Sequence, residues 1–349
     1  MADHEGADHE GADQEDADQE GADQEGAARP GTAGWLGAGV RLAGDQWGDP
    51  DAPPVLLLHG AGQTRHSWHR TGAALATAGW HAIALDLRGH GDSERSPAGR
   101  YRLGDFASDI VAVSRSLPAP PVLVGASLGG LAALLAVART GDQVPALVLV
   151  DISVHVEREG SSRVVRFMTA HTDGFASLEA AAAAIADFNP HRPPAKHLSG
   201  LRKNLRRRPD GRWVWHWDPR IMDGGPNSIA WQIPDPSTGE LMLSHHHEVR
   251  QAARSVTVPT LLIRGLRSEL VSERSVAALR EAIPHATHLD VAEAGHMIVG
   301  DRNDAFTAAL AGYLGRLRAG GEEPARPDVS ALSRRARQAE PSARLSPPE

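Results

Sequence analysis

Short apolar runs alternate with helical patterns along most of this chain, and this alternation restricts the possible fold more than any other feature of the sequence. The runs are five or six residues long and mostly continuously apolar, as expected of β-strands buried on both faces. Strands that alternate with helices form parallel sheets, because each crossover helix returns the chain to the same edge. The predicted strands are 55–59, 81–86, 121–125, 146–151, 260–264 and 287–291, and the predicted helices are 68–78, 103–117, 128–140 and one from 302.

A segment of roughly 100 residues separates the strand that ends at Asp151 from the strand that begins at Thr260, which is too long for one crossover. Ser177 is placed to cap a helix over 178–188. We therefore expect a mostly helical cap insertion, laid over the carboxyl edge of the sheet. Three leucines at helical spacing predict its second helix: Leu198, Leu201 and Leu205.

The cap also contains WVWHW at 213–217, which alternates like a short strand or a hairpin arm. Alternation places its three tryptophans on one side. There they either roof an apolar pocket or only pack the cap.

Both ends of the chain have the composition of disordered segments. Residues 1–26 repeat an imperfect five-residue unit with no large apolar side chain after Met1, and 319–349 is rich in Pro, Arg, Ser and Ala. The expected organisation is an acidic tail over 1–30, a core of 35–152 and 255–318, a cap over 153–254 and a second tail over 319–349.

The formal net charge of −8 comes from the acidic repeat. Residues 1–26 hold 11 acidic and no basic side chains, so the rest of the chain carries 36 basic and 33 acidic groups. A near-neutral body gives no case for a nucleic-acid partner.

No apolar run approaches the roughly 20 residues of a membrane span, and the chain has no Cys, which together favour a cytoplasmic location. The sequence leaves the oligomeric state open.

The strongest chemical signal is Gly125-Ala126-Ser127-Leu128-Gly129, which follows a predicted strand and precedes a predicted helix. A nucleophilic serine on a sharp strand-to-helix turn needs small residues two places to either side. The turn exposes the serine oxygen and directs the amino end of the helix at it, where backbone N–H groups stabilise negative charge. The pattern predicts that Ser127 is a nucleophile.

Four motifs in order resemble those of the α/β-hydrolase superfamily. They are Leu58-His59-Gly60, the run from Asp86 to Ser93 (DLRGHGDS), the GASLG turn, and Ala294-Gly295-His296-Met297. The resemblance covers about 55–318. It implies an α/β-hydrolase fold: an about eight-stranded, mostly parallel sheet flanked by helices, with an active site under a mostly helical cap.

The resemblance also implies a catalytic triad in the chain order serine, acid, histidine. His296 matches the position of the general base, after a glycine that follows the last strand. The family usually places Asp or Glu a few residues after the penultimate strand, where this chain offers Glu269, although most relatives have Asp there. Some relatives place the acid after the strand that follows the nucleophile, so Asp151 is the rival to Glu269.

The oxyanion hole implied by the family geometry consists of backbone N–H groups, those of Leu128 and Ala61. His59 and the run Asp86–Ser93 are expected to be structural. Neither a dinucleotide nor a P-loop spacing occurs, so no cofactor is expected. His245-His246-His247-Glu248 suggests a metal site, but consecutive residues of a helix face different directions, so we expect no metal and a solvated helix there.

The predicted function is that of a serine hydrolase that cleaves an ester, a lactone or a related small acyl substrate through Ser127, His296 and Glu269, with an acyl-enzyme intermediate. Serine at the turn argues against epoxide hydrolases and dehalogenases of this fold, which have Asp there. Carbon–carbon bond hydrolysis, cofactor-free haloperoxidase or perhydrolase chemistry, and a non-catalytic ligand-binding role remain the alternatives.

Overall fold

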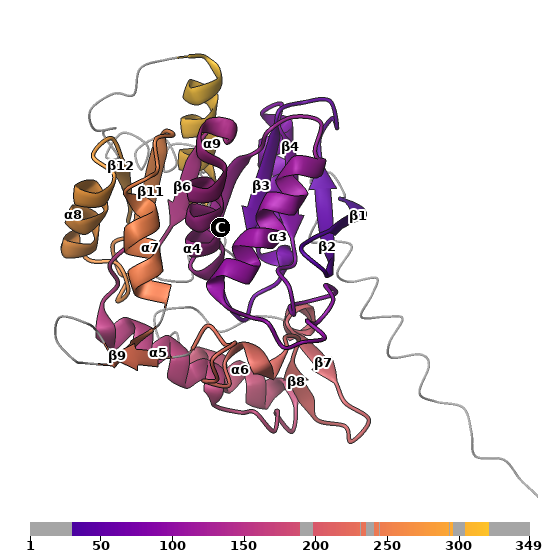
Figure 1. Cartoon of the computed structure of the whole chain (residues 1–349). Helices are drawn as coiled ribbons and strands as arrows, with labels where there is room; N and C mark the ends of the chain where they lie inside the picture. The colour runs from indigo at the N-terminus through magenta and orange to yellow at the C-terminus, as the bar shows by residue number, and fades with distance from the viewer. Residues whose placement is uncertain are drawn as a thin grey trace, which may run out of the picture.

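The computed structural model describes residues 30–188, 198–230, 232–234, 241–243, 245–292, 294–295 and 304–320 (Figure 1). Within these ranges the main sheet has eight strands in the order β1-β2-β4-β3-β5-β6-β11-β12. The pairs β1–β2 and β2–β4 are antiparallel, and the other neighbouring strands are parallel. The strands are β1 (Gly31–Leu36), β2 (Arg41–Trp47), β3 (Pro54–Leu58), β4 (His81–Leu85), β5 (Val122–Ala126), β6 (Leu147–Val150), β11 (Thr260–Gly265) and β12 (Thr287–Val291).

The predicted fold class is confirmed, and the six strands predicted from apolar runs correspond to β3, β4, β5, β6, β11 and β12. The pattern missed β1 and β2. These two strands form the antiparallel edge of the sheet; no residue of β1 is buried and β2 is only partly buried, so neither has a continuous apolar run.

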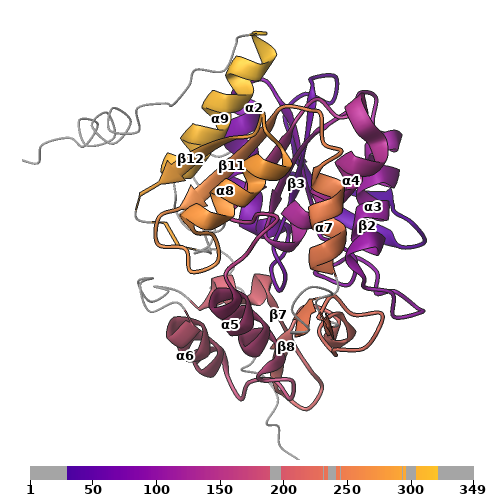
Figure 2. The same cartoon turned by 60° about the vertical axis from the view of Figure 1, so that its left-hand side comes forward.

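Alternate residues of the buried strands point to opposite faces of the sheet and enter two separate cores. Leu56 and Leu58 pack with residues of α3 and α4, whereas Val55 and Leu57 pack with residues of α2 and α9. Figure 2 shows the sheet between these two layers. The core helices are α2 (His69–Thr77), α3 (Leu103–Ser116), α4 (Leu128–Thr140), α7 (His245–Ala253), α8 (Glu273–Ala282) and α9 (Asp304–Arg318). None of the helices in the described ranges is long and apolar enough to cross a membrane.

The insertion after β6 lies across the carboxyl ends of the parallel strands, at the bottom of Figure 1. Its helix over 178–188 is confirmed as α6 (Leu178–Phe188), and α5 (Arg158–Thr169) precedes it. The short elements that follow are the 3₁₀ turns Ser199–Lys203 and Pro219–Ile221 and the strands β7 (Leu205–Arg207), β8 (Trp213–Trp215), β9 (Gln232–Pro234) and β10 (Leu241–Leu243).

The predicted second cap helix is wrong. Leu201 lies in a 3₁₀ turn, and Leu205 begins β7, which pairs antiparallel with β8. The reason is the turn Pro209-Asp210-Gly211, where Gly211 has φ of 82° and the Asp210 carboxylate accepts from the backbone N–H of Arg212. This turn folds the flanking residues into a hairpin, and Leu205 is buried there against cap aromatics. The predicted strand at WVWHW is confirmed.

Backbone hydrogen bonds attach the cap to the loop that follows β4. The N–H of Gly91 donates to the carbonyl of His216 at 2.8 Å, and the N–H of Asp218 donates to the carbonyl of Gly89 at 2.7 Å. The Tyr101 hydroxyl donates to the Asp218 carboxylate at 2.6 Å. The DLRGHGDS segment therefore has the structural role that was expected, because it holds the cap over the sheet.

Candidate active site

Ser127 lies at the turn between β5 and α4 in a backbone conformation that few residues other than glycine adopt, with φ of 45° and ψ of −116°. Strain of this kind persists only where the surrounding structure enforces it, and it concentrates at functional sites. The conformation presents the serine side chain to a cavity at the carboxyl edge of the sheet.

The two glycines around Ser127 are required by close backbone approaches. A Cβ atom on Gly125 would lie 2.4 Å from the backbone of Gly129, and one on Gly129 would lie 2.4 Å from the carbonyl oxygen of Leu58. A side chain at Gly125 would push α4 away from β5, and one at Gly129 would push α4 away from the end of β3. The spacing of the motif is thus a packing requirement of the sharp turn.

Two backbone N–H groups near Ser127 have no hydrogen-bond acceptor among the described residues, those of Ala61 and Leu128. Leu128 is the first residue of α4, where the N–H has no intrahelical partner. Ala61 follows Gly60, at which a Cβ atom would lie 3.3 Å from Ser127 Cβ. The arrangement leaves two backbone donors close to the serine.

Histidines hold the loop that contains Ala61. The Nδ1–H of His59 donates to the Gly60 carbonyl at 2.7 Å, since its Nε2 accepts from the Leu87 N–H at 3.0 Å. In the same way Nε2 of His90 accepts from the Gly62 N–H at 3.3 Å. Burial lowers the pKa of His59 to about 4 and that of His90 to about 3, so both rings are neutral at pH 7. Neutral rings keep the acceptor nitrogens that fix this loop.

Glu269, the predicted triad acid, lies on the surface. Its side chain is 58% exposed, and Arg163 of α5 donates to its carboxylate at 2.5 Å. The pair joins the loop after β11 to the cap. This placement gives Glu269 a surface ion pair and turns its carboxylate away from the interior of the site.

Asp151, the rival, is completely buried at the end of β6. Its backbone has φ of 48°, and its carboxylate accepts from the backbone N–H of Gly265 at 3.1 Å and from the Ser268 hydroxyl at 2.6 Å. These two hydrogen bonds hold the carboxylate in a fixed position. The structure thus presents one preorganised, buried carboxylate at the carboxyl end of the strand next to β5.

His296 lies outside the described residues, but the two residues before it are described. A Cβ atom on Gly265 would lie 2.4 Å from the carbonyl oxygen of Ala294, which also accepts from the Arg267 N–H at 2.9 Å. The loop after β12 is therefore packed on the loop that donates to Asp151.

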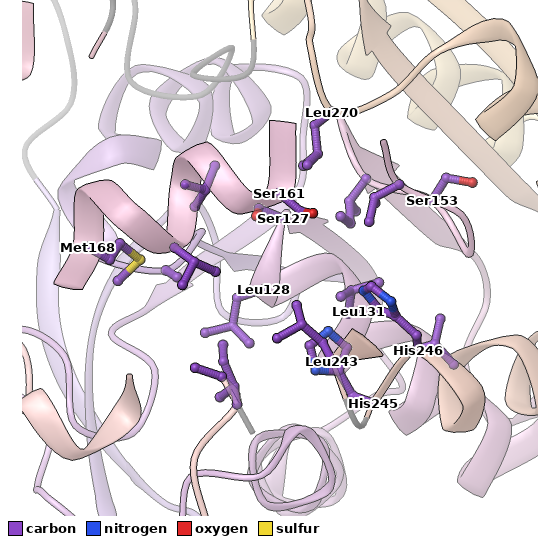
Figure 3. Close-up of a pocket in the computed structure, with 18 of the residues that line it drawn as sticks. Ser127, Leu128, Leu131, Ser153, Ser161, Met168, Leu243, His245, His246 and Leu270 are labelled. Atoms are coloured by element: carbon purple, nitrogen blue, oxygen red, sulfur yellow. The ribbon is translucent and has the colours of Figure 1, made fainter. Parts of the chain in front are cut away.

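The cavity beside Ser127 encloses roughly 730 Å³ of empty space, its open mouth included, between the sheet edge and the cap. Figure 3 shows Ser127 and Leu128 on one side and Met168 of α5 on another. The described lining is predominantly aliphatic and has no Asp, Glu, Lys or Arg: Ala61, Leu128, Leu131, Ile152, Val154, Val156, Val164, Val165, Met168, Met222, Ile229, Ala230, Leu243, Val249 and Leu270, with Ser127, Ser153, Ser161, His245 and His246.

Two lining residues, His245 and His246, contradict the expectation of a solvated helix at 245–248. His245 is 7% exposed and lies with Val249 on the buried side of α7, whereas His247 is exposed. The missed signal was the spacing of His245, Val249 and Ala253, which marks one face of a helix. No group of three or more His, Asp or Glu side chains in the described ranges could hold a metal ion.

Comparisons with known proteins agree with this fold. A family model described as the alpha/beta hydrolase fold matches residues 53–302. Esterase Rv0045c of Mycobacterium tuberculosis is 29% identical over 276 residues, which cover 77% of this chain and 85% of that protein. 2-(Acetamidomethylene)succinate hydrolase of Mesorhizobium japonicum is 29% identical over 217 residues, 62% of this chain and 72% of that protein.

Solved structures give the same result for the fold. A crystal structure of E-2-(acetamidomethylene)succinate hydrolase matches with a TM-score of 0.68 at 23% identity, over 82% of this chain and 99% of that one. A structure of the Mycobacterium tuberculosis esterase Rv0045c matches with a TM-score of 0.64 at 27% identity, over 89% of this chain and 99% of that one. The chain belongs to the α/β-hydrolase fold family and is a hydrolase of that fold.

Proposed function

We propose that this hydrolase cleaves carboxylic esters or lactones through an acyl-enzyme on Ser127, with His296 as general base and Asp151 as the acid that orients it. The observation that carries the proposal is the strained Ser127 at the wall of an apolar cavity, close to the acceptor-free N–H groups of Ala61 and Leu128. A nucleophile and two oxyanion donors are what acyl transfer requires. The esterase name of a 29% identical relative supports the same reaction class.

Asp151 replaces Glu269 in the proposed triad because of burial and hydrogen bonding. The acid of a triad must be shielded from water and held rigidly, so that it fixes the tautomer of the histidine and balances its positive charge. Asp151 is fully buried and held by the Gly265 N–H and the Ser268 hydroxyl, whereas the Glu269 carboxylate is exposed and paired with Arg163. The contact between Gly265 and Ala294 supports a base loop close to Asp151.

The proposed reaction has two half-reactions. Ser127 Oγ attacks the acyl carbon while His296 takes its proton, and the carbonyl oxygen becomes an oxyanion that accepts from the N–H groups of Ala61 and Leu128. Collapse of the tetrahedral intermediate breaks the ester bond, and His296 returns the proton to the leaving alcohol. A water molecule, deprotonated by His296, then attacks the acyl-enzyme and releases the acid and Ser127.

The nucleophile is tested by treating the protein with a fluorophosphonate and mapping the adduct by mass spectrometry. We expect one adduct, on Ser127, that is absent in Ser127→Ala and strongly reduced in His296→Ala. Folded protein that gives no adduct, and that binds ester ligands equally well as Ser127→Ala, would instead indicate a non-catalytic binding role.

The acid is tested by comparing Asp151→Asn with Glu269→Gln, which make the same chemical change. Asp151→Asn should lower kcat on a p-nitrophenyl ester by roughly 10⁴-fold, because the amide cannot orient the histidine correctly. Glu269→Gln should retain kcat within about threefold, since an exposed ion pair contributes little. The reverse order of the two losses would restore Glu269 as the acid.

A further inference from the structure

The α7 wall of the cavity carries two imidazole rings in otherwise aliphatic surroundings. His245 and His246 both line the cavity, and their ring centroids lie 5.0 Å apart at an interplanar angle of 89°. Figure 3 shows both rings turned toward the interior of the cavity. Neither side chain is used by the proposed acyl transfer, so their presence in this wall requires its own explanation.

His245 holds a polar atom that the protein itself leaves without a partner. Its Nδ1 is buried and has no hydrogen-bond partner in the protein, and the residue as a whole is only 7% exposed. Burying a polar atom without a partner destabilises a protein, and such atoms in native structures commonly mark functional positions. If His245 served only to pack this wall, an aliphatic side chain would fill the same place without burying an unpartnered polar atom.

Both rings are uncharged at neutral pH. Burial lowers the pKa of His245 to about 3, although a hydrogen bond with the Ile229 backbone opposes this shift, and burial together with the charge of Arg250 lowers the pKa of His246 to about 4. A neutral imidazole offers one donor and one acceptor, and it does not attract an anion as a protonated ring would. The wall therefore suits a neutral group that can both donate and accept a hydrogen bond.

The rest of the described lining offers nothing to a charged group. It has no Lys or Arg to receive a carboxylate and no Asp or Glu to receive an ammonium group. The polar residues that remain besides Ser127 are Ser153 and Ser161, whose hydroxyls donate to the backbone carbonyls of Ser275 and Arg158. The imidazole pair is thus the part of the described wall where a polar substrate group finds a partner.

We propose that His245 and His246 bind a hydroxyl group on the substrate, so that the enzyme selects uncharged acyl substrates with an apolar chain that carries one hydroxyl. This inference rests on the proposed acyl transfer at Ser127 and adds the substrate class to it. A hydroxyl both donates and accepts, which matches the neutral imidazoles, and its binding gives Nδ1 of His245 the partner that it lacks.

The test uses ester substrates that differ in one group: p-nitrophenyl hexanoate, its 3-hydroxy and 6-hydroxy derivatives, and the mono-p-nitrophenyl ester of adipic acid. The native protein should hydrolyse the 3-hydroxy or the 6-hydroxy ester, whichever places its hydroxyl at the two imidazoles, with a kcat/KM at least about tenfold above that of the plain hexanoate. The adipate ester, with its carboxylate, should be the poorest substrate. Equal values for plain and hydroxylated esters would overturn the inference.

Variants locate the effect. His246→Leu and His245→Leu should each lower the ratio of kcat/KM for the hydroxylated ester to kcat/KM for plain hexanoate by about tenfold, to near one. The matched control is His247→Leu, which changes the exposed neighbour on the same helix and should preserve the preference. A preference that survives in both His245→Leu and His246→Leu would overturn the inference.

Thermal unfolding of the free protein distinguishes a ligand-binding role of His245 from a purely structural one. If Nδ1 is an unfilled ligand position, His245→Leu should leave the melting temperature unchanged or raise it, because an unpartnered polar atom is removed. A strong decrease would instead indicate a packing role and contradict the inference. Fluorophosphonate labelling of each variant keeps the two proposals apart: unlabelled Ser127 contradicts acyl transfer, whereas labelled protein without hydroxyl preference contradicts only the substrate assignment.

Discussion

The hydroxyl of Ser268 donates to the Asp151 carboxylate at 2.6 Å, across the boundary between the loops that follow β11 and β6. The same hydroxyl oxygen accepts from the N–H groups of Leu270 and Val271 at 3.1 and 3.2 Å, so it is fixed from both sides. Two neighbouring strands thereby present a serine and a buried carboxylate at almost the same point of the sheet edge.

This proximity predicts that the acid can be moved from one strand to the other. The double variant Asp151→Asn/Ser268→Asp should recover kcat by at least about tenfold over Asp151→Asn, because the new carboxylate lies next to the lost one. The single variant Ser268→Asp should lose stability, since two adjacent carboxylates cannot both ionise without repulsion. Steady-state kinetics and thermal unfolding check these outcomes; absence of any recovery would argue against Asp151 as the acid.

The strained backbone of Ser127 predicts an unusual order of stability among its variants. Ser127→Gly should be about 1 kcal/mol more stable than Ser127→Ala, because glycine adopts φ of 45° without strain. Ser161 in α5 is the control: there Ser161→Gly should be less stable than Ser161→Ala by about 1 kcal/mol. Urea unfolding measures both differences, and the same order at both positions would contradict the strain at Ser127.

Arg65 and Arg206 both contact Asp92, yet their removal should differ greatly in effect. Arg65 is buried and also pairs with Asp45 and Asp86, and these carboxylates raise its pKa against the desolvation that lowers it. Arg65→Met should therefore destabilise by about 3–5 kcal/mol, because it leaves buried carboxylates unpaired.

Arg206→Met should cost at most about 1 kcal/mol, since both partners of that pair are nearly half exposed. Chemical unfolding of the two variants gives the comparison. Equal losses would show that the cap contact of Asp92 carries as much of the stability as the buried network.

The two neutral histidines that hold the oxyanion loop predict loss of stability in acid. In the unfolded chain both have a pKa near 6.5, whereas burial lowers it to about 4 for His59 and about 3 for His90. Their contribution is complete above about pH 6.5 and is lost progressively as pH falls from there to the folded values, because the unfolded state binds the protons first.

The free energy of unfolding should therefore fall by on the order of 1 kcal/mol per pH unit for each ring between pH 6 and 4. Urea unfolding at several pH values measures this slope. His90→Gln should reduce the slope, and a slope that is unaffected by His90→Gln would contradict this account.

The sequence by itself determined the features that depend on local pattern. Runs such as VLLL and LVLV, bounded by turn residues, favour central strands buried on both faces, and the glycines around Ser127 satisfy close backbone contacts at one strand-to-helix turn. The edge strands β1 and β2 were missed, and β7 was misassigned to a helix. No residue of β1 is buried and β2 is only partly buried, so neither has an apolar run, and at β7 a turn overrides the spacing of the leucines.

Only the tertiary structure decided which carboxylate faces inward and which histidines line the cavity. Asp151 and Glu269 are both acidic residues after a strand, and nothing in their neighbours along the chain separates them. The difference arises because β6 and β11 pair in the sheet, so that Gly265 and Ser268 donate to Asp151 while Arg163 of the cap holds Glu269 at the surface. Burial and hydrogen bonding depend on segments more than 100 residues apart in sequence, and they become visible only when those segments are packed together.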